Sequence, residues 1–187
     1  HYKRIVTWTH DRDFHDIVDL RDKSRDTSFN YNFHDYPFYN QDVNATWLGV
    51  SGSPVQLFDY FKREEEENAI FYTPYMIYSY SPQTLPQFNT KTPYTELGYW
   101  GTLFANKKME ETNIRFLHTQ NFTPSFNINF LYQRFGAAGM LEHEKTDNRT
   151  LALTGNYLGK RYMAQGGYIF NRIKRDENGG ISDPTMV

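Results

Sequence analysis

The sequence predicts an all-β protein: an antiparallel transmembrane β-barrel, present as the N-terminal part of a larger barrel and preceded by a loop-rich segment. Three observations favour this fold class. Polar and apolar residues alternate along several runs, Phe, Tyr and Trp together outnumber Ile, Leu and Val, and the connections between the runs are alternately short and long. Alternation with a period of two is typical of a strand whose two faces differ chemically.

Residues 1–93 are expected to form the loop-rich segment, with short strands. One strand is expected over Arg4–Thr9, which is rich in residues of high β-propensity. The spacing of apolar residues predicts a helical turn over Asp11–Asp19. Thr46–Val50 is a further strand candidate, and a turn follows at Gly52–Pro54. This segment either plugs the barrel or lies on its periplasmic side.

Residues 94–187 are expected to hold the first strands of the barrel. Thr95–Ala105 and Thr112–Asn121 are the first two candidates. Within the second, we place Arg115 inward, because Arg at the bilayer midplane costs about 2–4 kcal/mol on the lipid face. Its two apolar neighbours then face outward.

The strongest alternation follows in Ser125–Gln133 and Thr150–Tyr157, and a weaker run covers Tyr162–Arg172. Each is close to the ten or so residues with which a tilted strand crosses a bilayer. Leu131 is the one exception to the alternation of the first run. The apolar side is expected to face lipid through Phe126, Ile128, Phe130, Tyr132, Leu151, Leu153 and Tyr157. The polar side is expected to line a pore through Asn127, Asn129, Gln133, Thr150, Thr154, Asn156, Gln165 and Asn171.

The connections between these strands orient the chain. Asn121–Pro124 and Leu158–Arg161 are short, whereas Arg134–Asn148 and the stretch from Lys174 onward are long. Bacterial barrels have short periplasmic turns and long extracellular loops, so the short connections are expected on the periplasmic side. The strand candidates are too few to close a barrel, which needs about 8 strands at least. We therefore expect a longer protein, or another chain, to supply the remaining wall.

Composition argues against several other classes of protein. The formal net charge of −2 gives no electrostatic basis for binding nucleic acid. The absence of cysteine excludes disulfides and thiolate metal sites. There is no apolar run of the roughly 18 residues that a transmembrane helix needs. The 15 Tyr, 15 Phe and 3 Trp suit a barrel with aromatic girdles.

No catalytic, cofactor-binding or metal-binding set stands out, and we expect no enzyme activity. His10–Asp13 and Glu142–Glu144 place carboxylates beside a histidine, but a solvated loop is the simpler interpretation of both. The acidic run Glu64–Glu67 is interpreted in the same way. Aromatic residues near the N-terminus could stack on sugars or pack against neighbouring strands: Tyr31, Phe33, Tyr36, Phe38 and Tyr39.

Two motifs resemble those of a known family. Phe88-Asn-Thr-Lys-Thr-Pro-Tyr-Thr95 resembles a signature of the putative porins of Bacteroidota, and Leu48-Gly-Val-Ser-Gly-Ser-Pro54 resembles an element upstream of it. Glu177–Ile181 is similar to a loop of the same family. The resemblance implies a large outer-membrane β-barrel, several times longer than this chain. It also implies that a segment like residues 1–93 precedes the first barrel strands.

We therefore expect a porin-like protein of the cell outer membrane that allows passive diffusion of small polar solutes. Uncharged hydrogen-bonding groups let such solutes pass without holding them tightly. The expected partners are outer-membrane lipid and either other outer-membrane subunits or copies of the same chain. The alternative is a non-enzymatic structural or binding β-protein. That protein is either a barrel scaffold in an outer-membrane assembly or a soluble β-sandwich that binds glycans.

Overall fold

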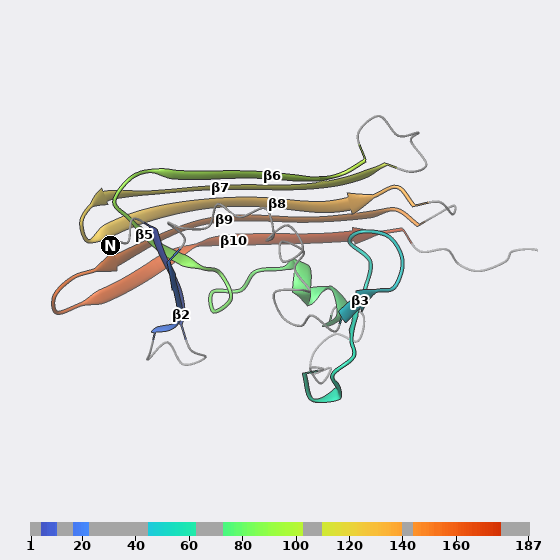
Figure 1. Cartoon of the computed structure of the whole chain (residues 1–187), viewed down its shortest axis with the longest axis horizontal. Helices are drawn as coiled ribbons and strands as arrows, with labels where there is room; N and C mark the ends of the chain where they lie inside the picture. The colour runs from blue at the N-terminus through green and yellow to red at the C-terminus, as the bar shows by residue number, and fades with distance from the viewer. Residues whose placement is uncertain are drawn as a thin grey trace, which may run out of the picture.

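The computed structural model describes residues 5–10, 17–22, 45–62, 73–102, 110–139 and 144–176. Within these ranges the chain is all-β, with antiparallel strands and two short 3-10 helices (Figure 1). The predicted fold class is confirmed at this level. No helix among the described residues is long and apolar enough to cross a membrane.

A five-stranded antiparallel sheet, which we call the wall, dominates the structure (Figure 1). Its strands are joined in chain order, β6-β7-β8-β9-β10. Their bounds are β6 Tyr94–Gly101, β7 Glu111–Thr123, β8 Phe126–Ala137, β9 Thr146–Leu158 and β10 Met163–Arg175. Each edge strand pairs with one neighbour only in the described part of the chain, so the sheet is open, as expected for part of a barrel wall.

The N-terminal elements lie on one side of the wall (Figure 1). Three short strands form a second sheet in the order β2-β1-β5, and two more form the hairpin β3-β4. The bounds are β1 Ile5–His10, β2 Ile17–Asp22, β3 Ala45–Trp47, β4 Val55–Leu57 and β5 Gln87–Thr90. The two 3-10 helices are η3 Tyr60–Lys62 and η4 Thr73–Tyr78. The chain therefore passes from this layer into the wall directly after β5.

Several predicted boundaries are wrong. β8 extends to Ala137 and β9 begins at Thr146. Part of the predicted loop Arg134–Asn148 therefore belongs to these strands. Charged residues suggested a loop there, but Asp147 pairs with arginines on β8 and β9, which lets the ladder continue. The predicted helical turn over Asp11–Asp19 is also wrong at its end, because β2 begins at Ile17 and pairs with β1. Residues 11–16 lie outside the described residues.

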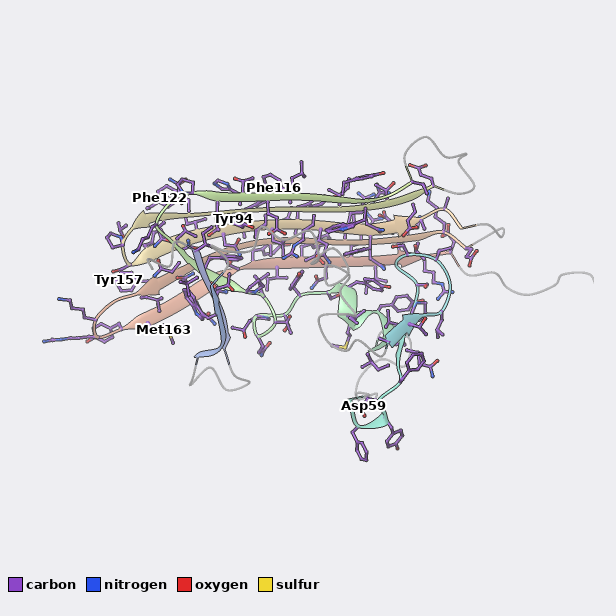
Figure 2. The ribbon with its side chains drawn as sticks, viewed as in Figure 1. Asp59, Tyr94, Phe116, Phe122, Tyr157 and Met163 are labelled. Atoms are coloured by element: carbon purple, nitrogen blue, oxygen red, sulfur yellow. The ribbon has the colours of Figure 1, made fainter. Side chains whose placement is uncertain are left out.

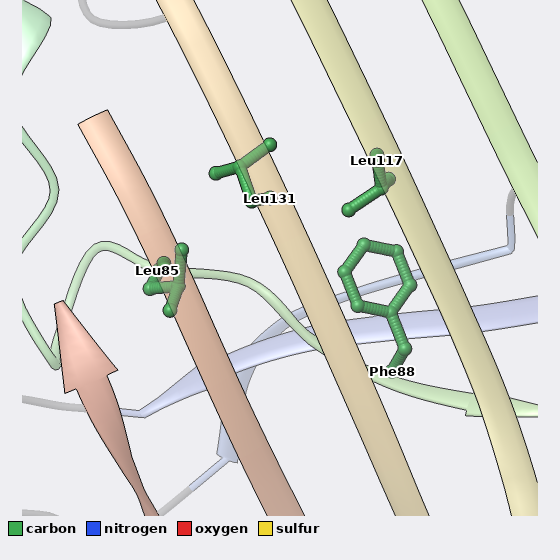
Figure 3. Packing of buried hydrophobic residues seen from close by; sticks show 5 residues of the cluster. Leu85, Phe88, Leu117 and Leu131 are labelled. Atoms are coloured by element: carbon green, nitrogen blue, oxygen red, sulfur yellow. The ribbon is translucent and has the colours of Figure 1, made fainter. Parts of the chain in front are cut away.

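A small apolar core joins the two layers (Figure 3). Leu85 and Phe88, from the N-terminal layer, pack with Leu117 of β7 and Leu131 of β8. All four side chains are almost fully buried, and Phe88 is 0% exposed. Burial of such side chains contributes roughly 1.5–3 kcal/mol each, so this contact fixes the N-terminal layer to the wall.

Candidate functional site

Alternation divides the side chains of the wall between two faces. We call the face toward the N-terminal elements the inner face and the opposite one the outer face. The register places Asn127 opposite Asn156 and Gln133 opposite Thr150, so amides and hydroxyls share rows across the strands. All eight residues predicted to line a pore lie on the inner face: Asn127, Asn129, Gln133, Thr150, Thr154, Asn156, Gln165 and Asn171.

Most of these polar residues are covered by protein. Exposures on β8 and β9 run from 1% at Asn129 to 7% at Thr154. On β10, Asn171 is half-buried, and Gln165 is exposed. We call the part of the chain that lies over them the cover; it comprises residues 51–53 and 75–90. Contact of these side chains with water in a pore stays a prediction.

The first contact of the cover is made by the tight turn around Gly52. Thr146 donates a hydrogen bond to the carbonyl of Ser51 (2.6 Å), and the Asn148 amide donates one to the carbonyl of Gly52 (2.7 Å). The Ser51 hydroxyl in turn donates to Asn113 of β7 (2.8 Å). Gly52 has φ of 85°, and a Cβ there would lie 3.0 Å from both Asn148 Nδ2 and Thr146 Oγ1. Glycine is therefore required by both the backbone and the space.

The second contact is made by the backbone of Tyr78 and Tyr80. Thr150 donates to the Tyr78 carbonyl (3.2 Å). The side chain of Asn171 donates to the Tyr80 carbonyl (2.8 Å) and accepts from the Tyr80 N–H (3.2 Å). The Tyr78 hydroxyl donates to the carbonyl of Ser53 (2.8 Å), and burial raises the pKa of that hydroxyl far above its usual range. An asparagine of the wall thus pairs with the cover as a strand backbone would.

The third contact involves the end of the cover that leads into β6. Asn156 donates to the carbonyl of Phe88 (3.2 Å), and Asn121 accepts a hydrogen bond from the Thr90 N–H (2.9 Å). Asn127 donates to Asn121 (2.7 Å), which links β8 to this junction. Wall amides therefore bind backbone groups of the cover along its whole length.

One apolar row crosses the inner face, and sequence analysis did not assign it a role. Leu117, Leu131, Ala152 and Ile169 are opposite one another in register on β7 to β10. Leu85 and Phe88 of the cover pack against this row. In the sequence, this apolar row was visible only because Leu131 breaks the alternation of its strand. Other cover-binding residues that were missed are Asn113, Asn121, Thr146 and Asn148.

The cover does not satisfy every polar group beneath it. Among the described residues, Asn129 Oδ1, Asn148 Oδ1 and Thr154 Oγ1 are buried without a hydrogen-bond partner. Each such group costs on the order of 1–3 kcal/mol. The cover is therefore docked by specific contacts, yet it is less well matched to the wall than a protein core would be.

The outer face carries a band of apolar side chains and has no covering layer among the described residues (Figure 2). Leu153 is 49% exposed, and Tyr168 and Phe170 on β10 are exposed as well. The seven residues predicted to face lipid all lie here: Phe126, Ile128, Phe130, Tyr132, Leu151, Leu153 and Tyr157. Their contact with lipid stays a prediction.

The apolar band on the outer face is displaced between β7 and β8. On β7, His118 lies 2.8 Å from the Thr95 hydroxyl, yet its neighbour in register on β8 is the apolar Phe130. At the other end, Ile114 on β7 is opposite Arg134 on β8. The band is therefore shifted along the strands between β7 and β8.

Comparison with known families shows to which family the chain belongs. The sequence profile of the putative porin family matches residues 11–187. The chain belongs to the putative porin family. No curated protein and no solved structure matches it.

In this porin-family chain, the two family-like motifs are the parts that join cover and wall. Leu48–Pro54 contains the turn that binds Thr146 and Asn148 on the inner face. Phe88–Thr95 contains the buried Phe88, then the corner at residues 91–93, and then the start of β6. Docking of the cover accounts for Gly52 in the first motif and for Phe88 in the second.

The other candidates yield no site in the described part of the chain. No group of three or more His, Cys, Asp or Glu side chains there could hold a metal ion. Residues 11–13, 64–67 and 142–143 lie outside the described residues, as do Tyr31, Phe33, Tyr36, Phe38 and Tyr39.

Proposed function

We propose that this chain builds part of the wall of an outer-membrane porin through which small polar solutes diffuse passively. The cover then lies on the lumen side of the wall. The observation that carries the proposal is the separation of the two faces, with apolar side chains outside and amides and hydroxyls inside. This is the pattern of a transmembrane barrel, whose outer band meets hydrocarbon while its interior is polar.

The outer face favours a membrane location over a soluble sandwich. Leu97 on β6 is 74% exposed, and Leu153 on β9 and Tyr168 and Phe170 on β10 are exposed as well. A contiguous apolar surface is unusual on a soluble monomer and marks a membrane or a partner. The three-stranded sheet β2-β1-β5 supplies a second layer on the inner face only.

The position of the cover bears on the route of the solute. Barrels of about 16–18 strands leave an aqueous channel, and those of about 22 strands carry a plugged lumen. A cover that binds one part of the wall leaves room for a solute in a wide barrel. A non-conducting scaffold is the second candidate, because the cover buries most of the amides that would line a channel.

Conductance of the full-length protein in a planar lipid bilayer tests this proposal. We expect stepwise ohmic conductance from the unmodified protein. Phe88→Ala should raise the conductance, because it removes the buried anchor of the cover. The matched control is Phe116→Ala on the outer face, which removes the same side chain without touching the cover.

Two results would count against a pore. If the unmodified protein and Phe88→Ala both insert but carry no current, the scaffold is correct. If the protein is monodisperse in water without detergent, the chain is a soluble β-protein.

A further inference from the structure

A row of arginines crosses three strands at one end of the outer face. Arg134 on β8 is opposite Arg149 on β9, and Arg149 is opposite Arg172 on β10. Lys174 follows two residues later on β10 and is opposite Asp147. Four cationic side chains thus share a small surface with a single carboxylate. We call Arg134, Arg149, Arg172 and Lys174 the basic cluster.

The one carboxylate is already occupied. Asp147 Oδ1 accepts a hydrogen bond from Arg134 Nε (3.0 Å), and Arg149 binds the same carboxylate through Nε (3.0 Å) and Nη2 (2.8 Å). Arg172 and Lys174 are exposed and have no ion pair within the described residues.

Among the described residues, no ion pair joins the basic cluster to an acid other than Asp147. Glu111 has inner-face register on β7, and Glu144 precedes β9. Glu110 and Asp176 lie beyond the ends of β7 and β10.

Like charges directly opposite each other destabilise a sheet. Asp147 compensates the pair of Arg134 and Arg149. The pair of Arg149 and Arg172 has no carboxylate of its own among the described residues, so an anion bound there would be favourable.

The basic cluster borders the apolar band. The next outer-face row, two residues along each strand, is Tyr132, Leu151 and Phe170. Two residues of strand span about 7 Å, so the guanidinium groups lie one step beyond the apolar surface. A lipid that rests its acyl chains on the apolar band would place its headgroup at this level.

The connections between strands indicate which leaflet is involved. The basic cluster lies at the end of the wall where residues 102–110 and 138–145 connect the strands. The opposite end has the shorter connections 124–125 and 159–162. Long connections face outward in bacterial barrels, so the cluster would lie in the outer leaflet.

We propose that the basic cluster binds the phosphate groups of a phosphorylated glycolipid of the outer leaflet. Guanidinium groups match phosphate oxygens through paired N–H donors, which a lysine cannot do. Arg172 and Lys174 supply unpaired donors, and Arg149 is 42% exposed in its side chain beside them. The acyl chains lie along Leu151, Phe170 and the rows beyond. Free phosphate makes no use of those rows and binds more weakly.

The test uses the full-length protein in neutral detergent micelles and measures its affinity for purified lipid A. The comparison probes are phosphatidylcholine, which has acyl chains without net charge, and inorganic phosphate. In one variant, Arg149→Gln and Arg172→Gln are combined. The matched control combines Lys160→Gln and Arg161→Gln, which removes two exposed cations at the opposite end of the wall.

We expect lipid A to bind the unmodified protein and the control equally, and to bind the cluster variant roughly tenfold more weakly or worse. Inorganic phosphate should bind all three weakly. Equal affinity for the control and cluster variants would overturn the proposal, as would binding of inorganic phosphate as tight as that of lipid A. A change in oligomeric state without a change in lipid affinity would show instead that the cluster contacts a second copy.

The lipid site rests on the proposed outer-membrane location, but its test is distinct from the test of conductance. Both variants should insert into bilayers and keep the conductance of the unmodified protein. A protein that conducts but shows no preference for lipid A refutes the lipid site alone.

Discussion

The two faces of the wall use the same strands and the same period, yet they meet different kinds of neighbour. The inner face meets one particular segment of the chain, through hydrogen bonds such as those between Asn171 and the backbone of Tyr80. The outer face meets no described part of the protein. The inner face is therefore constrained by shape and by hydrogen-bond geometry. Apart from local contacts such as the ion pairs of Asp147 with Arg134 and Arg149, the outer face is constrained mainly by polarity.

The contrast is clearest for a single residue type. Leu131 and Leu153 are on neighbouring strands, but Leu131 is 0% exposed on the inner face and Leu153 is 49% exposed on the outer face. The first packs against Leu85 and Phe88 of the cover. The second has only its strand neighbours for contact. An identical change at each should therefore have different effects.

The largest expected difference comes from Leu131→Ala compared with Leu153→Ala. Leu131→Ala should cost about 2–5 kcal/mol, because it leaves a cavity where the cover is anchored. Leu153→Ala should cost much less, because the side chain is half exposed. Limited proteolysis of the reconstituted protein measures the effect as faster cleavage within residues 73–90. Equal cleavage of the two variants would remove the distinction between the faces.

Introducing a charged residue should have the larger effect on the outer face, in contrast to the truncation of a leucine. Leu153→Arg should impair bilayer insertion, because Arg on the lipid face costs about 2–4 kcal/mol near the midplane. The control is Gln165→Arg, an exposed position with inner-face register on β10. The shift of the folded band on an unheated SDS gel reports insertion. If both variants fold equally well, lipid does not contact the outer face.

Gly52→Ala tests the turn through which the cover binds the wall. Its positive φ and the 3.0 Å approach of Asn148 Nδ2 should make the variant less stable by on the order of 1–3 kcal/mol. Gly166→Ala is the matched control, since a Cβ there meets nothing within 4 Å. Thermal unfolding followed by tyrosine fluorescence compares the two. A stable Gly52→Ala protein would show that the turn is not held as described.

The smallest effects should come from changes of apolar shape. Leu97→Met, on the outer face, should alter stability by less than about 0.5 kcal/mol. Leu117→Met, at a fully buried position, should cost up to about 1.5 kcal/mol. Urea unfolding in detergent resolves this difference. Equal costs would indicate that the outer face is packed as tightly as the inner one.

Sequence alone predicted the five strands of the wall and the division of their faces, because alternation is a local signal. It placed Arg115 inward. In the structure, Arg115 is on the inner face, and its Nη1 lies 3.8 Å from Oε1 of Glu96. The cover could not be predicted in the same way. Its contacts join residues far apart in sequence, such as Ser51 with Thr146. No periodicity encodes such pairs.

The ends of β8 and β9 were predicted wrongly for a different reason. Arg134 and Asp147 look like loop residues by charge, but their ion pair lies across adjacent strands and supports the ladder. The exception of Leu131 was visible in the sequence and had no explanation until the cover was placed upon it. A break in a regular pattern marked the point where the second layer attaches.

The corner at residues 91–93 has a mechanical consequence. It alone separates β5, the last part of the cover, from β6, the first strand of the wall. Pro93 has no N–H for a ladder hydrogen bond and fixes its own φ, which favours a bend there over a continuous strand. Because this connection is so short, a cover that separates from the wall stays next to it. Its effective concentration at the inner face is therefore very high. Separation of the cover from the wall and its return would then be unimolecular. Their rates would not depend on the number of copies of the protein in the membrane.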